Sequence, residues 1–168
     1  MQNTKIIYLA GGCFWGTEAF MQRINGVIDA ESGYANGNTL NPTYQDVCSN
    51  SGHAEVVKVT YDNTQISLEK LLDYYFKVID PTSLNQQGAD KGVQYRTGVY
   101  YVDPNDKLII EKSLADLQKQ YSQPLVVENL PLEHYFPAEA YHQDYLDKNP
   151  NGYCHIDIQL MNDLLKNQ

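Results

Sequence analysis

A short apolar strand that ends in Gly-Gly-Cys determines the architecture at the start of this chain. Residues 6–10 are apolar and are typical of a buried strand. The glycine pair at 11–12 lets the backbone turn tightly. Residues 13–24 then have the composition of a helix and are followed by a helix-stop signal. The pattern predicts a strand, a tight turn and a helix, with Cys13 on the first turn of that helix.

The rest of the chain alternates between strand and helix patterns. Ser67 is a typical helix N-cap, and Asp103-Pro104 is a typical helix start. The polar stretch 82–96 has neither a helical nor a strand period, and long irregular segments of this kind often carry function. The expected strands are 27–34, 54–61, 97–102 and 124–130. The expected helices begin at 67, 103 and 138, and they end at Asp80-Pro81, near Tyr121 and at 148. In the second of these helices, the residues expected along one side are Leu108, Ile110, Leu114, Leu117 and Tyr121.

This order of elements predicts an α+β fold of two layers, in which a mixed, mostly antiparallel sheet carries helices on one face. At 168 residues the chain fits a single domain, residues 1–168. The C-terminal segment, from about residue 131 to 168, has a looser pattern. We expect this segment to wrap around the core.

The charge and the cysteines limit the classes of function. The net charge is −9 and the Lys and Arg residues are scattered singly, so we expect no binding to nucleic acid or to an anionic membrane surface. No apolar window is long enough to span a bilayer or to form a signal-peptide core, which favours a cytoplasmic protein. Three cysteines are an odd number, which argues against a disulfide framework. None of them has the close-spaced partners of a metal site, so we expect no metal.

Cys13 is the candidate nucleophile. At the start of a helix, backbone N–H groups and the helix dipole favour an anion, which lowers the pKa of a thiol. Phe14 and Trp15, the only tryptophan of the chain, place an apolar wall beside the sulfur. The alternative is a buried structural cysteine at a tight turn, with the two rings as ordinary core residues.

Four short segments carry a family resemblance. They are Gly-Cys-Phe-Trp-Gly at 12–16, Tyr-Gln-Asp-Val-Cys at 44–48 with Gly-His-Ala-Glu at 52–55, the stretch 85–96, and Asn-Gly-Tyr-Cys at 151–154. In this order they resemble the type A peptide-methionine sulfoxide reductases, over about residues 5 to 155. The resemblance implies a ferredoxin-like α/β core and an enzyme that reduces the S epimer of methionine sulfoxide, free or in proteins. It also implies thioredoxin as the reductant and no cofactor, and we expect a monomer.

The same resemblance implies roles for individual residues. Glu55 is the implied general acid, because a carboxyl between apolar neighbours is desolvated, and desolvation raises its pKa. Tyr44 and Tyr95 are the implied donors to the sulfoxide oxygen, and the two rings after Cys13 are the implied methyl pocket. Asp90 is implied to bind a substrate amide or to orient the site. For Glu55 the alternative is a solvated glutamate at the end of a strand.

Cys154 is the implied resolving thiol. It follows a turn-rich segment that could bring it to Cys13, whose sulfenic acid would condense with it to a disulfide. Cys48 is expected to be inert. Many members of the family carry two C-terminal cysteines, whereas only Cys154 follows residue 48 here. The Cys13–Cys154 disulfide would therefore meet the reductant itself.

Three other functions stay open from the residues alone. A thiol peroxidase would share the sulfenic acid, although the Pro and Thr that peroxidases place before their cysteine are absent. A Cys-His hydrolase would use His53 or His142, which we expect to be hydrogen-bonded structural groups. A small acidic binding module would have inert thiols.

Overall fold

The structure is a computed structural model that describes residues 3–37, 40, 42–48, 52–87, 90–149, 152, 156 and 158–166. Its strands are β1 (Thr4–Gly11), β2 (Val27–Ala35), β3 (Ala54–Asp62), β4 (Gln86–Gln87), β5 (Asp90–Lys91), β6 (Thr97–Tyr101), β7 (Glu128–Pro131) and β8 (Tyr135–Pro137). Its helices are α1 (Phe14–Gln22), α2 (Tyr44–Cys48), α3 (Leu68–Lys77), α4 (Asp106–Gln118), α5 (Tyr145–Lys148) and α6 (Ile158–Lys166), with 3₁₀ turns η1 (Val93–Tyr95) and η2 (Ala140–His142).

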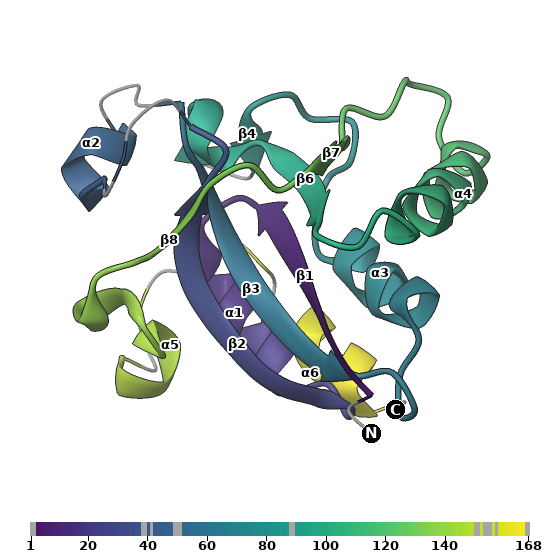
Figure 1. The fold of residues 1–168 in the computed structure, drawn as a ribbon, viewed down its shortest axis with the longest axis horizontal. Helices are drawn as coiled ribbons and strands as arrows, with labels where there is room; N and C mark the ends of the chain where they lie inside the picture. The colour runs from purple at the N-terminus through teal and green to yellow at the C-terminus, as the bar shows by residue number, and fades with distance from the viewer. Residues whose placement is uncertain are drawn as a thin grey trace.

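Six strands form one mixed sheet in the order β7-β6-β1-β3-β2-β8 (Figure 1). Every neighbouring pair is antiparallel except β6 and β7, which are parallel. The helix α1 lies behind β2 and β3 in this view. The prediction of an α+β fold with a mixed, mostly antiparallel sheet is therefore confirmed.

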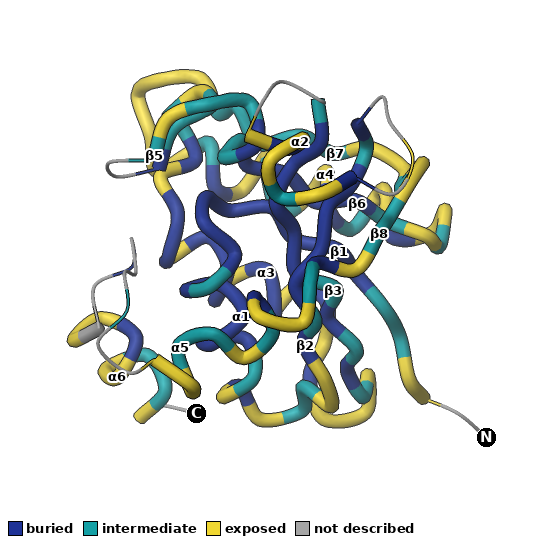
Figure 2. The backbone as a smooth tube through the Cα atoms, turned by 90° about the vertical axis from the view of Figure 1, so that its left-hand side faces the viewer, coloured by how far each residue is buried: buried dark blue, intermediate teal, exposed yellow. Residues whose placement is uncertain are grey.

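The core lies between the sheet and its helices. Alternate residues of a strand face the same side, so Ile7 and Leu9 of β1 join Val57 and Val59 of β3 on the helix side. Their partners come from α1, α3, α4 and α6: Phe20, Met21, Leu71, Leu72, Ile110, Leu117 and Met161. Figure 2 shows the buried backbone gathered in the centre of the molecule, with exposed segments around it.

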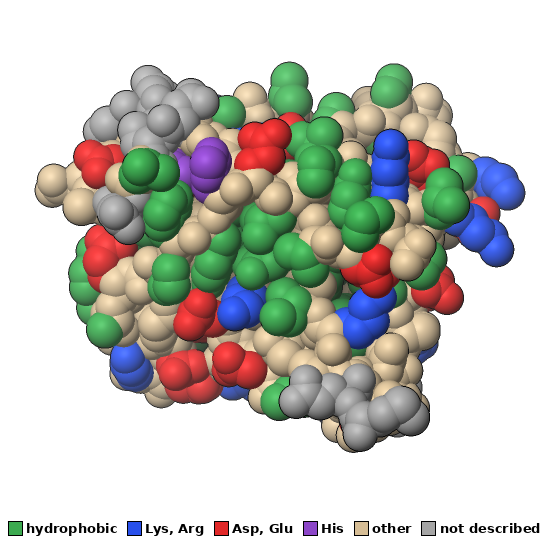
Figure 3. Space-filling view, viewed as in Figure 1, with side chains coloured by type: hydrophobic (Ala, Val, Ile, Leu, Met, Phe, Trp, Pro, Cys, Tyr) green, Lys and Arg blue, Asp and Glu red, His purple; other side chains and the backbone are tan. Residues whose placement is uncertain are grey.

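The opposite face of the sheet is covered by the segment that follows β7. Tyr8 of β1 and Tyr100 of β6 form a smaller cluster on this face, and Leu132 and Tyr135 pack against it. The Leu132 N–H donates to the Tyr101 carbonyl at 2.9 Å, and β8 pairs with the edge of β2. In Figure 3 this face carries exposed apolar side chains between scattered charged ones. This segment therefore crosses the sheet, as the wrapping expectation requires.

Several local predictions are confirmed. The Ser67 hydroxyl accepts the Lys70 N–H at 3.1 Å and caps α3. The alternation of 57, 59 and 61 on β3 puts all three side chains in the core. A separate finding is that no helix in the described ranges is long and apolar enough to cross a membrane.

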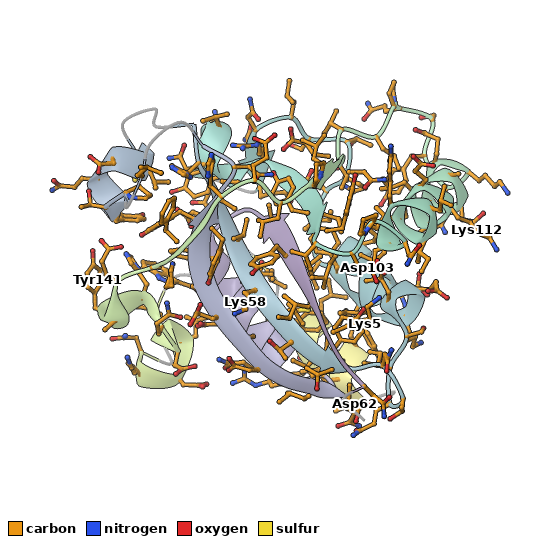
Figure 4. All side chains as sticks on the ribbon, in the orientation of Figure 1. Lys5, Lys58, Asp62, Asp103, Lys112 and Tyr141 are labelled. Carbon is orange, nitrogen blue, oxygen red and sulfur yellow. The ribbon has the colours of Figure 1, made fainter. Side chains whose placement is uncertain are left out.

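Other boundaries were predicted wrongly. The helix expected from Asp103 begins at Asp106, because the Asp103 carboxylate accepts the Asn105 N–H at 2.9 Å and forms a turn instead. Lys5 of β1 fixes this turn by donating to both aspartates (Figure 4). On α4, Leu108 is 70% exposed and does not share the buried side of Ile110. The strand expected from 124 begins only at Glu128.

The polar stretch 82–96 contains more structure than its sequence indicates. It forms the β4–β5 pair and the turn η1. The Gln87 side chain both accepts the Asp80 N–H at 2.8 Å and donates to the Asp80 carbonyl at 2.9 Å. The polar side chain of Gln87 thus makes the hydrogen bonds that hold this stretch to Asp80. Contacts made by polar side chains leave no apolar period in the sequence.

The helix expected over 138–148 is split into η2 and α5. Between them Gln143 is extended and Asp144 is left-handed, with φ 53°. Gln143 accepts the Ser32 N–H at 2.9 Å and donates to the Ser32 carbonyl at 2.8 Å, while the Asp144 N–H donates to Glu18 at 2.7 Å. These long-range hydrogen bonds replace helical ones. The sequence interpretation also missed α2, β8 and α6.

Candidate active site

Cys13 lies at the turn between β1 and α1. Gly12 has φ 82°, in the region that favours glycine, and Cys13 itself is extended at φ −60° and ψ 125°. Cys13 is therefore the N-cap of α1, one residue before the predicted first turn, and it is 6% exposed. The N–H groups at the start of α1 favour an anion at this position.

Glu55 lies next to this turn, near the start of β3. Its side chain is 1% exposed, and its Oε1 accepts the Phe14 N–H at 3.2 Å. Its buried Oε2 has no hydrogen-bond partner among the described residues. Burial raises the pKa of Glu55 to about 8, with the nearby Asp90 charge adding to the rise and the Phe14 N–H opposing it. The expected desolvated carboxyl is present, and it holds a proton at neutral pH.

Tyr44 at the start of α2 and Tyr95 in η1 hydrogen-bond to each other. Burial raises the pKa of both phenols, and the Glu55 charge raises it further. The Cys13 charge adds to the rise at Tyr95. Both phenols therefore stay protonated near neutral pH, within electrostatic range of the carboxyl and, for Tyr95, of the thiol.

Asp90 belongs to the short strand β5 and is half-buried. Its charge raises the pKa of both Glu55 and Tyr95. The predicted site residues of three separate segments thus come together, whereas Cys154, from the fourth segment, lies outside the described residues.

The two rings after Cys13 divide between the core and the surface. Phe14 is 1% exposed and lies 5.7 Å from the Tyr34 ring and 5.2 Å from the His142 ring. Trp15 is half-buried and stacks on Tyr145 at 3.7 Å. Adjacent helix residues cannot both face the core fully, which explains why one ring is buried and the other is partly exposed.

His53 and His142 are hydrogen-bonded, as expected. His53 accepts the Gly37 N–H at 3.1 Å, and the Nδ1 of His142 accepts the Trp15 Nε1–H at 3.0 Å. Burial lowers the pKa of His142. In both rings Nδ1 accepts a hydrogen bond, so the proton of a neutral imidazole lies on Nε2 and neither nitrogen is free to take a proton from a nucleophile. This argues against the hydrolase alternative.

Glu139 is a functional candidate that the sequence interpretation missed. Its Oε1 accepts the Tyr34 hydroxyl at 2.7 Å, and its Oε2 accepts the Tyr44 N–H at 3.0 Å and the Tyr141 hydroxyl at 3.2 Å. It thereby joins β2, α2 and the C-terminal segment. The one available signal was a carboxylate among the aromatic residues of 135–142.

Cys48 is exposed at the end of α2. Partial burial of its sulfur raises the pKa of the thiol, and the Glu55 charge raises it further. A raised pKa makes a thiol a poorer nucleophile at neutral pH, so its expected inertness stays a prediction with this support. In the described part of the chain, no group of three or more His, Cys, Asp or Glu residues could hold a metal ion.

This arrangement combines a thiol at a helix N-terminus, a protonated carboxyl, two phenols and aromatic rings. The chain matches the family model "Peptide methionine sulfoxide reductase" over residues 5–168. A peptide methionine sulfoxide reductase MsrA from Clostridium perfringens is 60% identical over 155 residues, which are 92% of this chain and 99% of that protein.

Solved structures agree with this match. The reduced form of Mxr1 from Saccharomyces cerevisiae superposes with a TM-score of 0.86 at 38% identity, covering 90% of this chain and 89% of that one. Mxr1 in complex with Trx2 superposes with a TM-score of 0.62 at 26% identity, covering 85% of each chain. The chain belongs to the peptide methionine sulfoxide reductase family, and it is a thiol-dependent enzyme that reduces methionine sulfoxide.

Proposed function

We propose that Cys13 is the nucleophile that reduces the S epimer of methionine sulfoxide, free or in proteins, and that Glu55 supplies the proton. The observation that carries this proposal is the Phe14 N–H, which donates to the buried Glu55 carboxyl at 3.2 Å. Phe14 directly follows Cys13, so the hydrogen bond holds a proton donor beside the thiol.

The reaction balances with these groups. The Cys13 thiolate attacks the sulfoxide sulfur and forms an S–S bond, and the S–O bond breaks as the protonated oxygen leaves as water. Attack of water on the Cys13 sulfur then breaks the S–S bond, which gives the Cys13 sulfenic acid and releases methionine. Protonation of the oxygen makes it a better leaving group. Glu55, whose pKa of about 8 keeps it protonated at neutral pH, is placed to give that proton. Tyr44 and Tyr95 assist as hydrogen-bond donors, since their raised pKa values keep both phenols protonated.

The substrate is held by apolar and polar groups on different elements. Phe14 and Trp15 would enclose the methyl group, which leaves the substrate sulfur facing Cys13. Asp90, whose charge reaches Glu55 and Tyr95, would bind a substrate amide or orient those groups.

The cycle closes through a second thiol. Cys154 would condense with the Cys13 sulfenic acid, which forms a disulfide and releases water. A dithiol then reduces the disulfide by exchange. Support for thioredoxin as that dithiol comes from the yeast Mxr1 structure in complex with Trx2. The odd number of cysteines, which argues against a disulfide framework, supports a reducing cytoplasm as the place of action.

An assay on the two resolved sulfoxide epimers, with dithiothreitol as reductant, tests this function. We expect reduction of the S epimer and none of the R epimer. Stopped-flow reaction with hydrogen peroxide separates the thiol peroxidase alternative. Equal rates on both epimers, or faster reaction with peroxide than with sulfoxide, would overturn the proposal.

A further inference from the structure

The Glu139 carboxylate lies where three separate parts of the chain meet. Its Oε1 accepts the Tyr34 hydroxyl of β2 at 2.7 Å, and its Oε2 accepts the Tyr44 backbone N–H of α2 at 3.0 Å. The same Oε2 accepts the Tyr141 hydroxyl at 3.2 Å. Figure 4 shows Tyr141 at the end of the molecule between α2 and α5. One side chain of the C-terminal segment therefore joins α2 to the sheet.

The donors on β2 and α2 are groups that need an acceptor. Tyr44 is the first residue of α2, and the first N–H groups of a helix have no partner within the helix. Tyr34 is fully buried, and a buried hydroxyl without a hydrogen bond is costly. Burial raises the pKa of Glu139, but the hydrogen bonds from Tyr34 and Tyr44 lower it more, so the net value is below the ordinary one and the group stays charged. A charged acceptor makes the stronger hydrogen bonds.

The β2 end of this link lies in register with the proposed acid. Tyr34 and Glu55 stand directly opposite each other where β2 pairs with β3. Burial raises the pKa of the Tyr34 and Tyr44 phenols most, and the Glu55 charge adds to the rise in each. Both phenols therefore lie within electrostatic range of the same carboxyl. Through Tyr34, the Glu139 carboxylate connects the strand pair that carries the acid to the helix that carries the second donor.

We propose that Glu139 is a positioning residue for oxygen transfer: it holds the start of α2 against β2, which fixes the Tyr44 phenol relative to the Glu55 carboxyl. The inference rests on the proposed function, because it takes Tyr44 as a donor to the sulfoxide oxygen. A hydrogen-bond donor stabilises a transition state most when it is already aimed at the place where charge develops. Loss of Glu139 should therefore slow oxygen transfer more than it weakens substrate binding.

Three substitutions separate this link from a general effect on the fold. Glu139→Ala removes both acceptor oxygens. Glu139→Gln keeps an oxygen for the Tyr44 N–H, and its amide N–H can donate to the Tyr34 hydroxyl, which can accept as well as donate. Tyr141→Phe is the matched control, because it removes only the third hydrogen bond to the same carboxylate and Tyr141 is 60% exposed. We expect Glu139→Ala to lower the saturating single-turnover rate with N-acetylmethionine S-sulfoxide about 2–10-fold, with KM changed less. The other two variants should lie closer to the wild type.

A double-mutant cycle with Tyr44→Phe, which keeps the backbone N–H but removes the phenol, tests the coupling. Glu139→Ala should lower the rate little further in the Tyr44→Phe background, because no phenol is left to be positioned. An equal fall in both backgrounds, or a rate for Glu139→Gln as low as that for Glu139→Ala, would overturn the proposal. If Glu139→Ala fails to fold, Tyr34→Phe breaks the same link from the β2 side and enters the same cycle with the same expected result.

Hydrogen exchange of the Tyr44 amide, measured by NMR, follows the position of α2 without any assay of activity. This amide should exchange faster in Glu139→Ala than in the wild type, and at the wild-type rate in Tyr141→Phe. Unchanged exchange in Glu139→Ala would also overturn the proposal. Absence of S-sulfoxide reduction by the wild type would refute the proposed function instead, and the exchange rates would still report the link between Glu139 and Tyr44.

Discussion

Replacing Glu55 by Gln should separate proton donation from shape at this site. The amide keeps the size of the side chain and an oxygen that can accept the Phe14 N–H, which donates at 3.2 Å in the wild type. It cannot give up a proton in this reaction. Loss of a general acid costs roughly 10²–10⁴-fold in rate, so the single-turnover rate with S-sulfoxide should fall by that factor while substrate affinity changes little.

The pH dependence gives the prediction a second readout. With a pKa of about 8, about nine in ten Glu55 side chains are protonated at pH 7 and about one in ten at pH 9. The wild-type single-turnover rate should therefore fall above pH 8, and this limb should be absent in Glu55→Gln. Titration of Cys13 acts in the opposite direction, so both proteins need comparison at several pH values.

The pH dependence of the free energy of unfolding should also reveal the Glu55 carboxyl, and the direction of the change can be predicted. The pKa rises from its ordinary 4.5 to about 8 on folding, and at 1.36 kcal/mol per pKa unit this amounts to about 5 kcal/mol. The folded state holds the proton longer than the unfolded state does, so this stability is fully present below pH 4.5 and is lost as the pH rises to 8. Glu55→Gln has no such loss, and urea unfolding should show its stability relative to wild type increasing from pH 5 to pH 8.

Glu18 provides the matched control. It is also 1% exposed, burial raises its pKa to about 7, and its oxygens accept the N–H groups of Ser32 and Asp144. Glu18→Gln should change the pH dependence of stability but leave the single-turnover rate within a few-fold. A near-wild-type rate for Glu55→Gln across pH 5 to 9 would refute the assignment of Glu55 as the acid. The proton would then come from Tyr44, Tyr95 or water.

The remaining predictions concern the thiols and the turn. Cys13→Ser should lose all turnover, because a hydroxyl is a far weaker nucleophile than a thiolate. Reduction of sulfoxide by this variant above the buffer rate would contradict the prediction. Cys48→Ser should keep a turnover rate within a few-fold of the wild type. Cys154→Ser should convert about one equivalent of substrate without reductant and turn over poorly with thioredoxin, whereas a Cys13–Cys48 disulfide in peptide maps of the oxidised wild type would reassign the resolving role. Gly12→Ala should lose about 1–2 kcal/mol of stability by urea unfolding, because Gly12 has φ 82°; an unchanged midpoint would show that the turn relaxes.

The elements that could be predicted are those whose signal is local. The Gly-Gly-Cys turn, the Ser67 cap and the alternation on β3 each depend on neighbours in sequence, and each is found. The break at Gln143 and Asp144 depends on hydrogen bonds to residues more than 100 positions away. A helical pattern in 138–148 cannot reveal partners on β2 and α1.

The same difference holds within the candidate site. Cys13, Glu55 and the tyrosines stand in recognisable segments, so the sequence indicated them. Glu139 stands in no such segment, and its partners Tyr44 and Tyr34 lie 95 and 105 residues away. Its role emerges only when the C-terminal segment returns to α2 and β2.

Because the C-terminal segment returns to α1, a delay separates the synthesis of Cys13 from the synthesis of the residues that pack beside it. The Trp15–His142 hydrogen bond joins residues 127 positions apart. At about 5–20 residues per second, translation takes about 6–25 s to travel between them. During this interval the nascent chain presents Cys13 before the rings of 139–145 can close around its neighbours. The rings of 139–145 therefore join the site only after this interval, and the rate of translation sets how long Cys13 is without them.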